Sequence, residues 1–308
     1  MLRFTFDNDA IEHLVRSDTF EEHRQEIQRA SNRQDLMMHL SRTNVLEIVK
    51  GVTERNFRRL QMLLRQAYAF GGRRNLLLSP SHHLKWGLGR VDPHTLNEWY
   101  NSFYNDVFQL FKAANYPEFQ ERYAKVSASL DRGNDAIWNN AKDVKQAILA
   151  KLDSKAKKKS ADWFLSPEGS SLFFDLMYST VLQQFNLGDD VIGLEREEVV
   201  RRLPSLVQFC DTFRTLQRKR IIEGHNPQKG DYFDIQKVVY LDLCDYIVSD
   251  DRRFRALVDA AGTSDLFGRA IPLSKFLQHI HRPFLLNRSI GPGHESAEVD
   301  RLKRLYEY

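Results

Sequence analysis

Acidic residues follow two predicted strands that lie far apart in the sequence. Asp7 comes directly after the apolar segment Leu2–Phe6, and Asp250 and Asp251 follow the β-branched run Tyr246–Val248. In open parallel sheets, ligands gather in the crevice beyond the carboxyl ends of the strands. Carboxylates from both segments are therefore expected to meet where chemistry is usually performed.

Two further acids extend this group. Asp234 is placed at the head of an apolar helix that feeds the Tyr246–Val248 strand, and Glu47 lies on the helix after a second strand. Four converging carboxylates without His or Cys partners are hard oxygen ligands that suit Mg²⁺ or Mn²⁺. Their mutual repulsion favours cation binding. Two such ions about 4 Å apart would clamp a phosphodiester, one activating water and the other stabilising the leaving oxygen.

The same acids could serve only as helix caps. Ser and Asp are preferred immediately before the first turn of a helix, and Arg252–Ala260 is predicted to be helical. Ser249 or Asp250 could cap that helix while Asp251 faces a cation. Capping and metal binding are thus compatible.

Strands that alternate with helices indicate a parallel sheet with right-handed crossovers. The predicted strands cover residues 2–6, 36–40, 75–79, 246–248 and 270–273. Residues 1–82 and 195–282 are expected to form the two halves of one α/β domain. A mostly helical insertion, 93–194, separates them, and 283–308 is a tail with a short helix.

Three helix boundaries follow from local signals. The first helix is predicted to begin at Ala10, and the last to cover Ser274–Ile280. A long helix is expected from about Glu195 to Glu223. Pro204 should bend or break it, because proline has no backbone N–H and clashes with the preceding turn.

Composition narrows the functional classes. With 308 residues and 42% hydrophobic residues, the chain can bury a substantial core, and its apolar runs are too short for a membrane span. A soluble protein without a secretory or transit peptide and without a membrane partner is expected. Two cysteines are too few for a disulfide framework, which fits the cytoplasm. The net charge of +4 does not by itself indicate a nucleic-acid binder.

The order of these elements resembles the PIN-domain nucleases, in particular the larger bacterial members. In that family a strand ends in Asp-x-Asn or Asp-x-Ser, and a second strand leads to a Ser and then a Glu on the next helix. An Asp-headed helix then precedes a strand that ends in Thr-x-Asp. The matching segments here are FTFDNDAIEHL, MMHLSRTNVLEIVKG, DYFDIQKVVYLDLCDYIVSDDRRF and GRAIPLSKFL. The resemblance covers residues 1–82 and 195–282 and leaves the helical insertion unmatched.

This resemblance implies a PIN-like three-layer α/β/α fold and a metal-dependent endonuclease. The implied catalytic residues and Mg²⁺ or Mn²⁺ ligands are Asp7, Glu47, Asp234 and Asp251, with Asp250, Asp231 and Asp9 as reserve ligands. Asp9 stands where a small polar residue is more usual in the family, and Asp231 rivals Asp234. Asn8 and Ser249 would hold the carboxylates in place. Hydrolysis would leave 5′-phosphate and 3′-hydroxyl ends, with RNA as the expected substrate and DNA as the alternative.

Basic and histidine residues near these segments could have functional or purely structural roles. Lys219, Arg220, Arg252 and Arg253 could bind backbone phosphates or be solvated helix ends. The pairs His82–His83 and His279/His281 have no matched third ligand in the sequence, so turn or surface positions are expected for them.

Two functions are consistent with these residues, and a third fits them less well. The first is an endonuclease, in the role of a toxin or defence effector, whose insertion selects RNA or binds a regulatory protein and which could form homo-oligomers. The second is a catalytically silent PIN-like module that binds RNA or a partner protein through the insertion. The third, a phosphatase-like or receiver-like domain that uses Asp250 and Asp251, lacks the matching lysine and nucleophile pattern.

Overall fold

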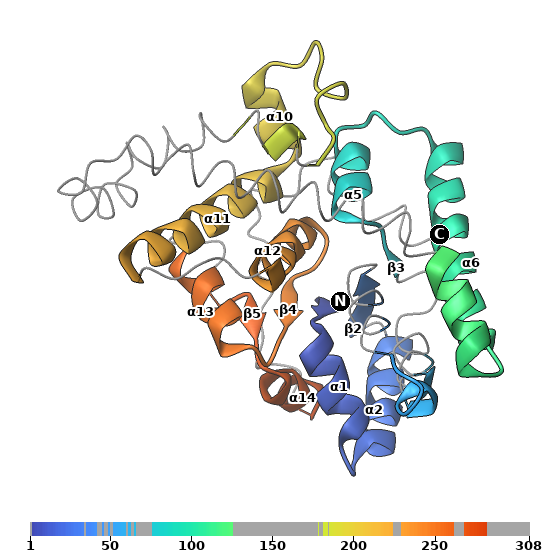
Figure 1. The fold of residues 1–308 in the computed structure, drawn as a ribbon. Coiled ribbons are helices and arrows are strands. Elements are labelled where there is room, and N and C mark those ends of the chain that lie inside the picture. Colours follow the sequence, from blue (N-terminus) through green and yellow to red (C-terminus); the bar gives the residue numbers. More distant parts are fainter. Residues whose placement is uncertain are drawn as a thin grey trace.

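The computed structural model describes residues 2–33, 35–41, 45, 49, 52–59, 61–62, 65, 76–125, 178, 181–183, 185–223, 229–261 and 268–281. Within these ranges, five parallel strands form one sheet in the order β3-β2-β1-β4-β5 (Figure 1). The strands are β1 (Leu2–Phe6), β2 (Leu36–Ser41), β3 (Leu76–Leu77), β4 (Tyr246–Val248) and β5 (Ala270–Ile271). The predicted α/β class with a parallel sheet is confirmed.

Strand β1 lies at the centre of the sheet. It pairs with β2 on one side, where Leu2 is opposite Leu36, and with β4 on the other, where Phe6 is opposite Val248. The two halves of the predicted domain therefore meet at β1 and β4. Because the chain winds outward in opposite directions from these two strands, their carboxyl ends border the switch point where open α/β sheets bind ligands.

One face of the sheet is covered by α1 (Asn8–Arg16), α2 (Phe20–Asn32) and α14 (Leu273–His281) (Figure 1). Phe4 and Phe6 point to this face, and both rings meet Phe276 of α14 edge to face, with centroids 4.9 and 5.0 Å apart. Edge-to-face packing suits the opposed charges of ring faces and edges. This aromatic cluster fixes α14 beneath β1.

The opposite face carries a second set of helices. Its members are α5 (Pro80–Gly87), α11 (Pro204–Glu223), α12 (Lys229–Gln236), the 3₁₀ helix η1 (Lys237–Asp242) and α13 (Arg252–Ala260). Ile247 of β4 points to this side and joins a buried cluster with Val238 and Phe254. Since apolar residues alternate between the two faces of β4, helices lie on both sides of the sheet and the fold has three layers.

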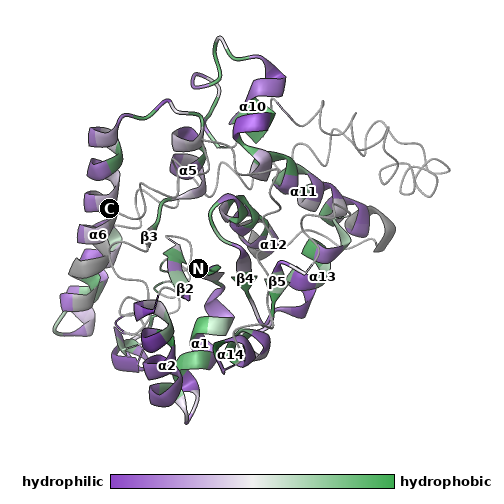
Figure 2. Cartoon of the chain, turned by 180° about the vertical axis from the view of Figure 1, so that it is seen from behind, coloured by the Kyte–Doolittle hydropathy of each residue, from purple (hydrophilic) through white to green (hydrophobic). Residues whose placement is uncertain are grey.

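Described parts of the predicted insertion extend these same cores. Leu110, in α6 (Pro93–Lys112), and Phe119, in the helical residues 116–125, belong to the cluster that contains Phe4. Val181 belongs to the cluster of the opposite face. The outer helices α2 and α6 are mostly hydrophilic in Figure 2, as expected for helices that bury one side. Most of 126–184 lies outside the described residues.

Several predicted boundaries differ from the structure. The first helix begins at Asn8 and not at Ala10, because Asp7 caps it. The long helix is divided at Leu203 into α10 (Arg196–Arg202) and α11, since Pro204 cannot donate a backbone hydrogen bond. The last strand ends at Ile271, and Leu273 already belongs to α14. Among the described residues, no helix has the length and apolarity that crossing a bilayer requires.

Candidate active site

Asp7 lies buried at the carboxyl end of β1 and caps α1. Its Oδ1 accepts a hydrogen bond from the backbone N–H of Asn8 at 2.7 Å, and its Oδ2 accepts one from Ser249 Oγ at 2.8 Å. Ser249 follows β4 and is fully buried. Parallel pairing of β1 with β4 brings these two residues together. The Ser249–Asp7 hydrogen bond is the contact through which Ser249 could hold the carboxylate in place.

Lys237 is the residue that the sequence analysis missed. Its side chain is 3% exposed, and its Nζ donates to Asp7 Oδ1 and, at 2.9 Å, to Asp234 Oδ1. An ammonium group buried this deeply requires paired carboxylates, because an unpaired buried charge is very costly. Lys237 therefore joins Asp7 and Asp234 into one buried charge cluster. Its signal in the sequence was its position three residues after Asp234, on the same helical face.

Asp234 lies within α12 and not at its head, so that prediction was wrong. The helix begins at Lys229, which puts Asp231 in its first turn and Asp234 near its end. Gly230 lowers the local helix propensity, but packing against neighbouring helices overrides such propensities over short spans. Burial raises the pKa of Asp234, Lys237 lowers it, and the charges of Asp7 and Asp251 raise it again.

Asp251 caps α13 itself, which corrects the expectation that Ser249 or Asp250 would do so. Its Oδ1 accepts from the backbone N–H groups of Arg253 and Phe254 at 2.6 and 3.2 Å, while its own N–H donates to Ser249 Oγ at 3.2 Å. Asp251 has the extended backbone of a cap residue. The capping carboxylate nevertheless stays close enough to Asp234 to raise its pKa.

Asp9, a reserve ligand in the sequence analysis, belongs to the same group of acids. Burial raises the pKa of Asp9, and the negative charges of Asp7 and Asp251 add to the rise. Asp7, Asp9, Asp234 and Asp251, together with Lys237, are called the carboxylate site from here on.

Asp250 faces different partners. Its Oδ1 accepts from the backbone N–H of Leu273 at 3.0 Å, and its Oδ2 lies 2.7 Å from His13 Nδ1. Through these contacts Asp250 ties the end of β4 to α14 and α1. The structure thus separates the two adjacent acids, with Asp251 near the other carboxylates and Asp250 bound to the helices on the opposite face.

The remaining predicted residues have varied positions. Glu47 lies outside the described residues, and so does the side chain of Arg220. Asn8 supports Asp7 through its backbone N–H, whereas its side-chain Oδ1 is buried without a hydrogen-bond partner. Arg252 and Arg253 are exposed at the start of α13, and Lys219 is half-buried on α11.

Arg255 is a further contact that sequence reasoning did not find. Its Nη1 donates to the backbone carbonyl of Ser249, which lies six residues earlier in the chain, before α13 begins. Since Ser249 Oγ holds both Asp7 and the N–H of Asp251, Arg255 fixes the residue that joins the two acids. A charged donor to a carbonyl is among the stronger hydrogen bonds in proteins.

Among the described residues, no three of the four acids place their ligand oxygens within 4.8 Å of one another. The four acids offer only oxygen ligands, which suit Mg²⁺ or Mn²⁺. When ionised they carry four negative charges against the single charge of Lys237. Burial raises the pKa of Asp9 and Asp234, and the charges of Asp7 and Asp251 add to the rise. No family model matches the chain, and no curated protein or solved structure matches it either. Support for a function therefore comes from the fold and from the carboxylate site.

Proposed function

We propose that this protein is a PIN-like, metal-dependent endonuclease with RNA as its substrate. The observation that carries the proposal is that buried Lys237 joins Asp7, at the carboxyl end of β1, to Asp234 of α12. Asp251, which follows β4, is near enough for its charge to raise the pKa of Asp234. The carboxyl ends of β1 and β4 border the switch point of the sheet, where open α/β folds bind their ligands. The reaction is hydrolysis of a phosphodiester bond.

Each residue of the carboxylate site has a part in this reaction. Asp7, Asp234 and Asp251 would hold Mg²⁺ or Mn²⁺, with Asp9 as a further oxygen donor and Glu47 as a ligand or as the group that orients the attacking water. A bound cation would polarise the phosphodiester and lower the pKa of water. Ser249 keeps Asp7 oriented through its hydroxyl group.

Lys237 supplies a fixed positive charge within this site. Its ammonium group neutralises Asp7 and Asp234 in part, at distances that allow hydrogen bonds to both. We therefore propose that one divalent cation is sufficient here, with Lys237 providing the charge that a second cation would provide in a two-metal site. Calorimetry would distinguish one cation per chain from two.

RNA binding would involve the exposed start of α13. Arg252 and Arg253 follow Asp251 directly and are exposed, so they can reach backbone phosphates beside the carboxylate site. Lys219 on α11 and the helical insertion would contribute further contacts, to RNA or to a regulatory protein. We place this activity in a toxin or defence effector of the cytoplasm, where the two free, buried cysteines would suit a reducing environment.

The test is cleavage of end-labelled RNA and DNA by the purified protein with Mn²⁺ or Mg²⁺. Wild-type protein should cut RNA and leave 5′-phosphate ends, and Asp7→Asn should not. Asp35→Asn is the matched control, because Asp35 lies just before β2, at the amino ends of the strands, and pairs with Arg33 on the surface. The proposal fails if wild type cuts neither nucleic acid, or if Asp7→Asn cuts equally well.

A catalytically silent binding module is the second candidate. The observation in its favour is again Lys237, because an ammonium group bonded to Asp7 and Asp234 neutralises part of the site without any metal. Such a module would show no heat of Mg²⁺ or Mn²⁺ binding. It would still bind RNA or a protein partner, and Asp7→Asn would leave that binding intact.

A further inference from the structure

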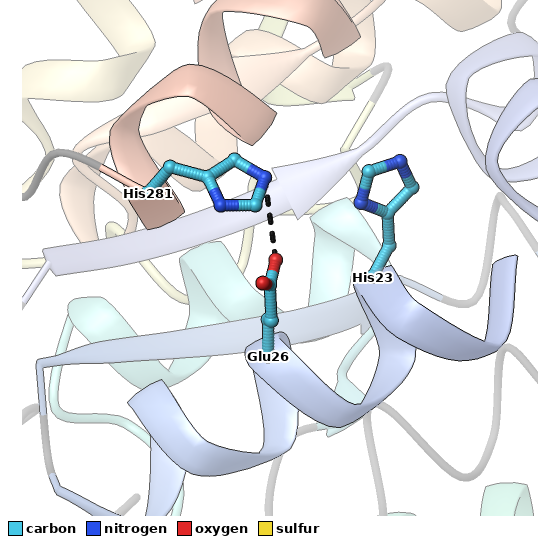
Figure 3. A group of neighbouring side chains, drawn as sticks. All are labelled: His23, Glu26 and His281. Atoms are coloured by element: carbon cyan, nitrogen blue, oxygen red, sulfur yellow. Dashed lines mark ion pairs between the residues drawn. The ribbon is translucent and has the colours of Figure 1, made fainter. Parts of the chain in front are cut away.

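Three potential metal ligands meet on the face of the sheet opposite η1. His23 and Glu26 lie one turn apart on α2, and His281 lies in the last turn of α14 (Figure 3). One ligand atom from each residue lies within 4.8 Å of the other two. His281 Nε2 is 3.2 Å from Glu26 Oε2, and the rings of His23 and His281 are 6.2 Å apart between centroids.

Two of the ligand atoms lack hydrogen bonds. Nδ1 of His23 and Oε2 of Glu26 are buried, and neither has a hydrogen-bond partner, although Glu26 Oε2 pairs electrostatically with His281. A buried polar atom without a partner costs about 1–3 kcal/mol. A cation placed between the three side chains would satisfy both atoms.

The other nitrogen of His23 already has an orienting partner. His23 Nε2 lies 3.0 Å from Thr19 Oγ1, which in turn lies 2.8 Å from Ser17 Oγ. When Nε2 carries the proton and donates it to Thr19, the lone pair of Nδ1 points to Glu26 and His281. Metal-binding histidines almost always donate their second N–H in this way.

We infer that His23, Glu26 and His281 form a zinc-binding site that is separate from the carboxylate site. Two imidazoles with one carboxylate suit Zn²⁺, whereas the carboxylate site offers only oxygen and suits Mg²⁺ or Mn²⁺. Tetrahedral zinc with bonds of about 2.0–2.1 Å brings its ligand atoms to roughly 3.3 Å from each other. The half-exposed side chain of His281 provides the freedom to close that gap and the route by which the ion arrives.

Zinc at this position would tie α14 to α2. The first residue of α14, Leu273, is held by Asp250, while its last, His281, is the zinc ligand. Helix α14 would then be fastened at both ends beneath β1 and β4. Since a ligand that binds only the folded state stabilises it by mass action, the expected effect is on stability and not on the chemistry of the carboxylate site.

Calorimetry with ZnCl₂ tests this inference on the metal-free full chain, with excess Mg²⁺ present to occupy oxygen-only sites. Wild-type protein should bind one zinc ion, and His23→Ala and His281→Ala should each weaken binding at least 10-fold. His94→Ala is the matched control, because His94 is also exposed and lies one turn from an acid, Glu98, but the described residues include no third ligand near this pair. It should bind zinc like wild type.

Thermal unfolding provides an independent readout. Zinc should raise the melting temperature of wild type and His94→Ala but not of His281→Ala, whose exposed side chain can be removed without unfolding the chain. Asp7→Asn should keep the zinc response, which separates this site from the proposed nuclease activity. The inference is overturned if wild type binds no zinc, or if His281→Ala binds it with unchanged affinity.

Discussion

The two ends of η1 place acids in contrasting surroundings. At its start, Lys237 lies between Asp7 and Asp234 beside the strand ends. At its other end, Asp242 is buried and accepts hydrogen bonds from the backbone N–H of Ser205, at 3.0 Å, and from Ser205 Oγ. Asp7 and Asp234 share the positive charge of one lysine, whereas Asp242 accepts hydrogen bonds from neutral donors.

This difference separates the proposed cation site from a buried acid whose contacts support the fold. Burial raises the pKa of Asp242 to about 7, although Ser205 and Arg269 lower it in part. His83, whose Nε2 lies 3.9 Å from Asp242, has its pKa lowered by burial to about 4. A buried acid can thus be tolerated by shifting its pKa towards the neutral form. A raised carboxyl pKa therefore does not by itself indicate a functional site.

Removing the lysine should produce the largest effect. Lys237→Met leaves Asp7 and Asp234 buried without their counter-charge, and breaking such a pair costs about 3–5 kcal/mol of unfolding free energy. Urea denaturation measures this loss. Mg²⁺ should restore part of the stability of the variant, because a cation can replace the ammonium group. Unchanged stability, with or without Mg²⁺, would show that Asp7 and Asp234 do not need the charge of Lys237.

A matched pair of acid variants should sharpen the contrast in activity. Asp234→Asn and Asp242→Asn each neutralise one acid in or next to η1. Asp234→Asn should reduce nuclease activity at least about 100-fold, since even indirect partners of a bound metal contribute 10–100-fold. Asp242→Asn should stay near wild type in the same RNA cleavage assay. Equal losses in both variants would indicate that the assay reports folding and not a role of Asp234 in the reaction.

The pH dependence of stability should show the smallest effect over any single pH unit. Unfolded Asp242 ionises near 3.8 and folded Asp242 near 7, so the stability it contributes is complete below about pH 4 and is lost as pH rises towards 7. Relative to Asp242→Asn, wild type should lose up to about 1.4 kcal/mol per pH unit in this window. Denaturation at several pH values measures it. A constant difference would mean that the pKa of Asp242 is not raised.

The stability that His83 contributes depends on pH in the opposite direction, which provides an internal check on that experiment. Its pKa falls from 6.5 to about 4 on folding, so the stability that it contributes is present above pH 6.5 and is lost as pH falls towards 4. The two dependences offset each other in the wild type. Asp242→Asn should therefore gain stability as pH rises from about 4 to 6.5.

Strand positions were predictable because short apolar runs end at polar residues. Leu2–Phe6 and Tyr246–Val248 are buried along their length, and Asp7 and Ser249 follow them directly. Boundaries that depend on packing were not predictable. Helix α12 begins at Lys229 because tertiary contacts override the low propensity of Gly230, which no local pattern records.

The acids of the candidate site were predictable, but the buried lysine among them, Lys237, was not. A lysine at helical spacing is usually solvated, and only the approach of β1 to η1 makes Lys237 a buried partner of Asp7. His281 was likewise dismissed for want of a third ligand. Its neighbours His23 and Glu26 lie on α2, and the contact exists only because α2 and α14 pack together. Long-range pairing, and not residue type, was the missing information.

The central position of β1 also governs when the carboxylate site comes into being. Asp7 leaves the ribosome first, but its partners Lys237 and Ser249 follow 230 and 242 residues later. At roughly 5–20 residues per second, synthesis delivers them on the order of tens of seconds afterwards. Until then β1 lacks its neighbour β4, and the acids remain apart. A growing chain therefore carries no assembled carboxylate site, so the proposed nuclease would remain inactive towards the messenger RNA and transfer RNA that surround it during translation.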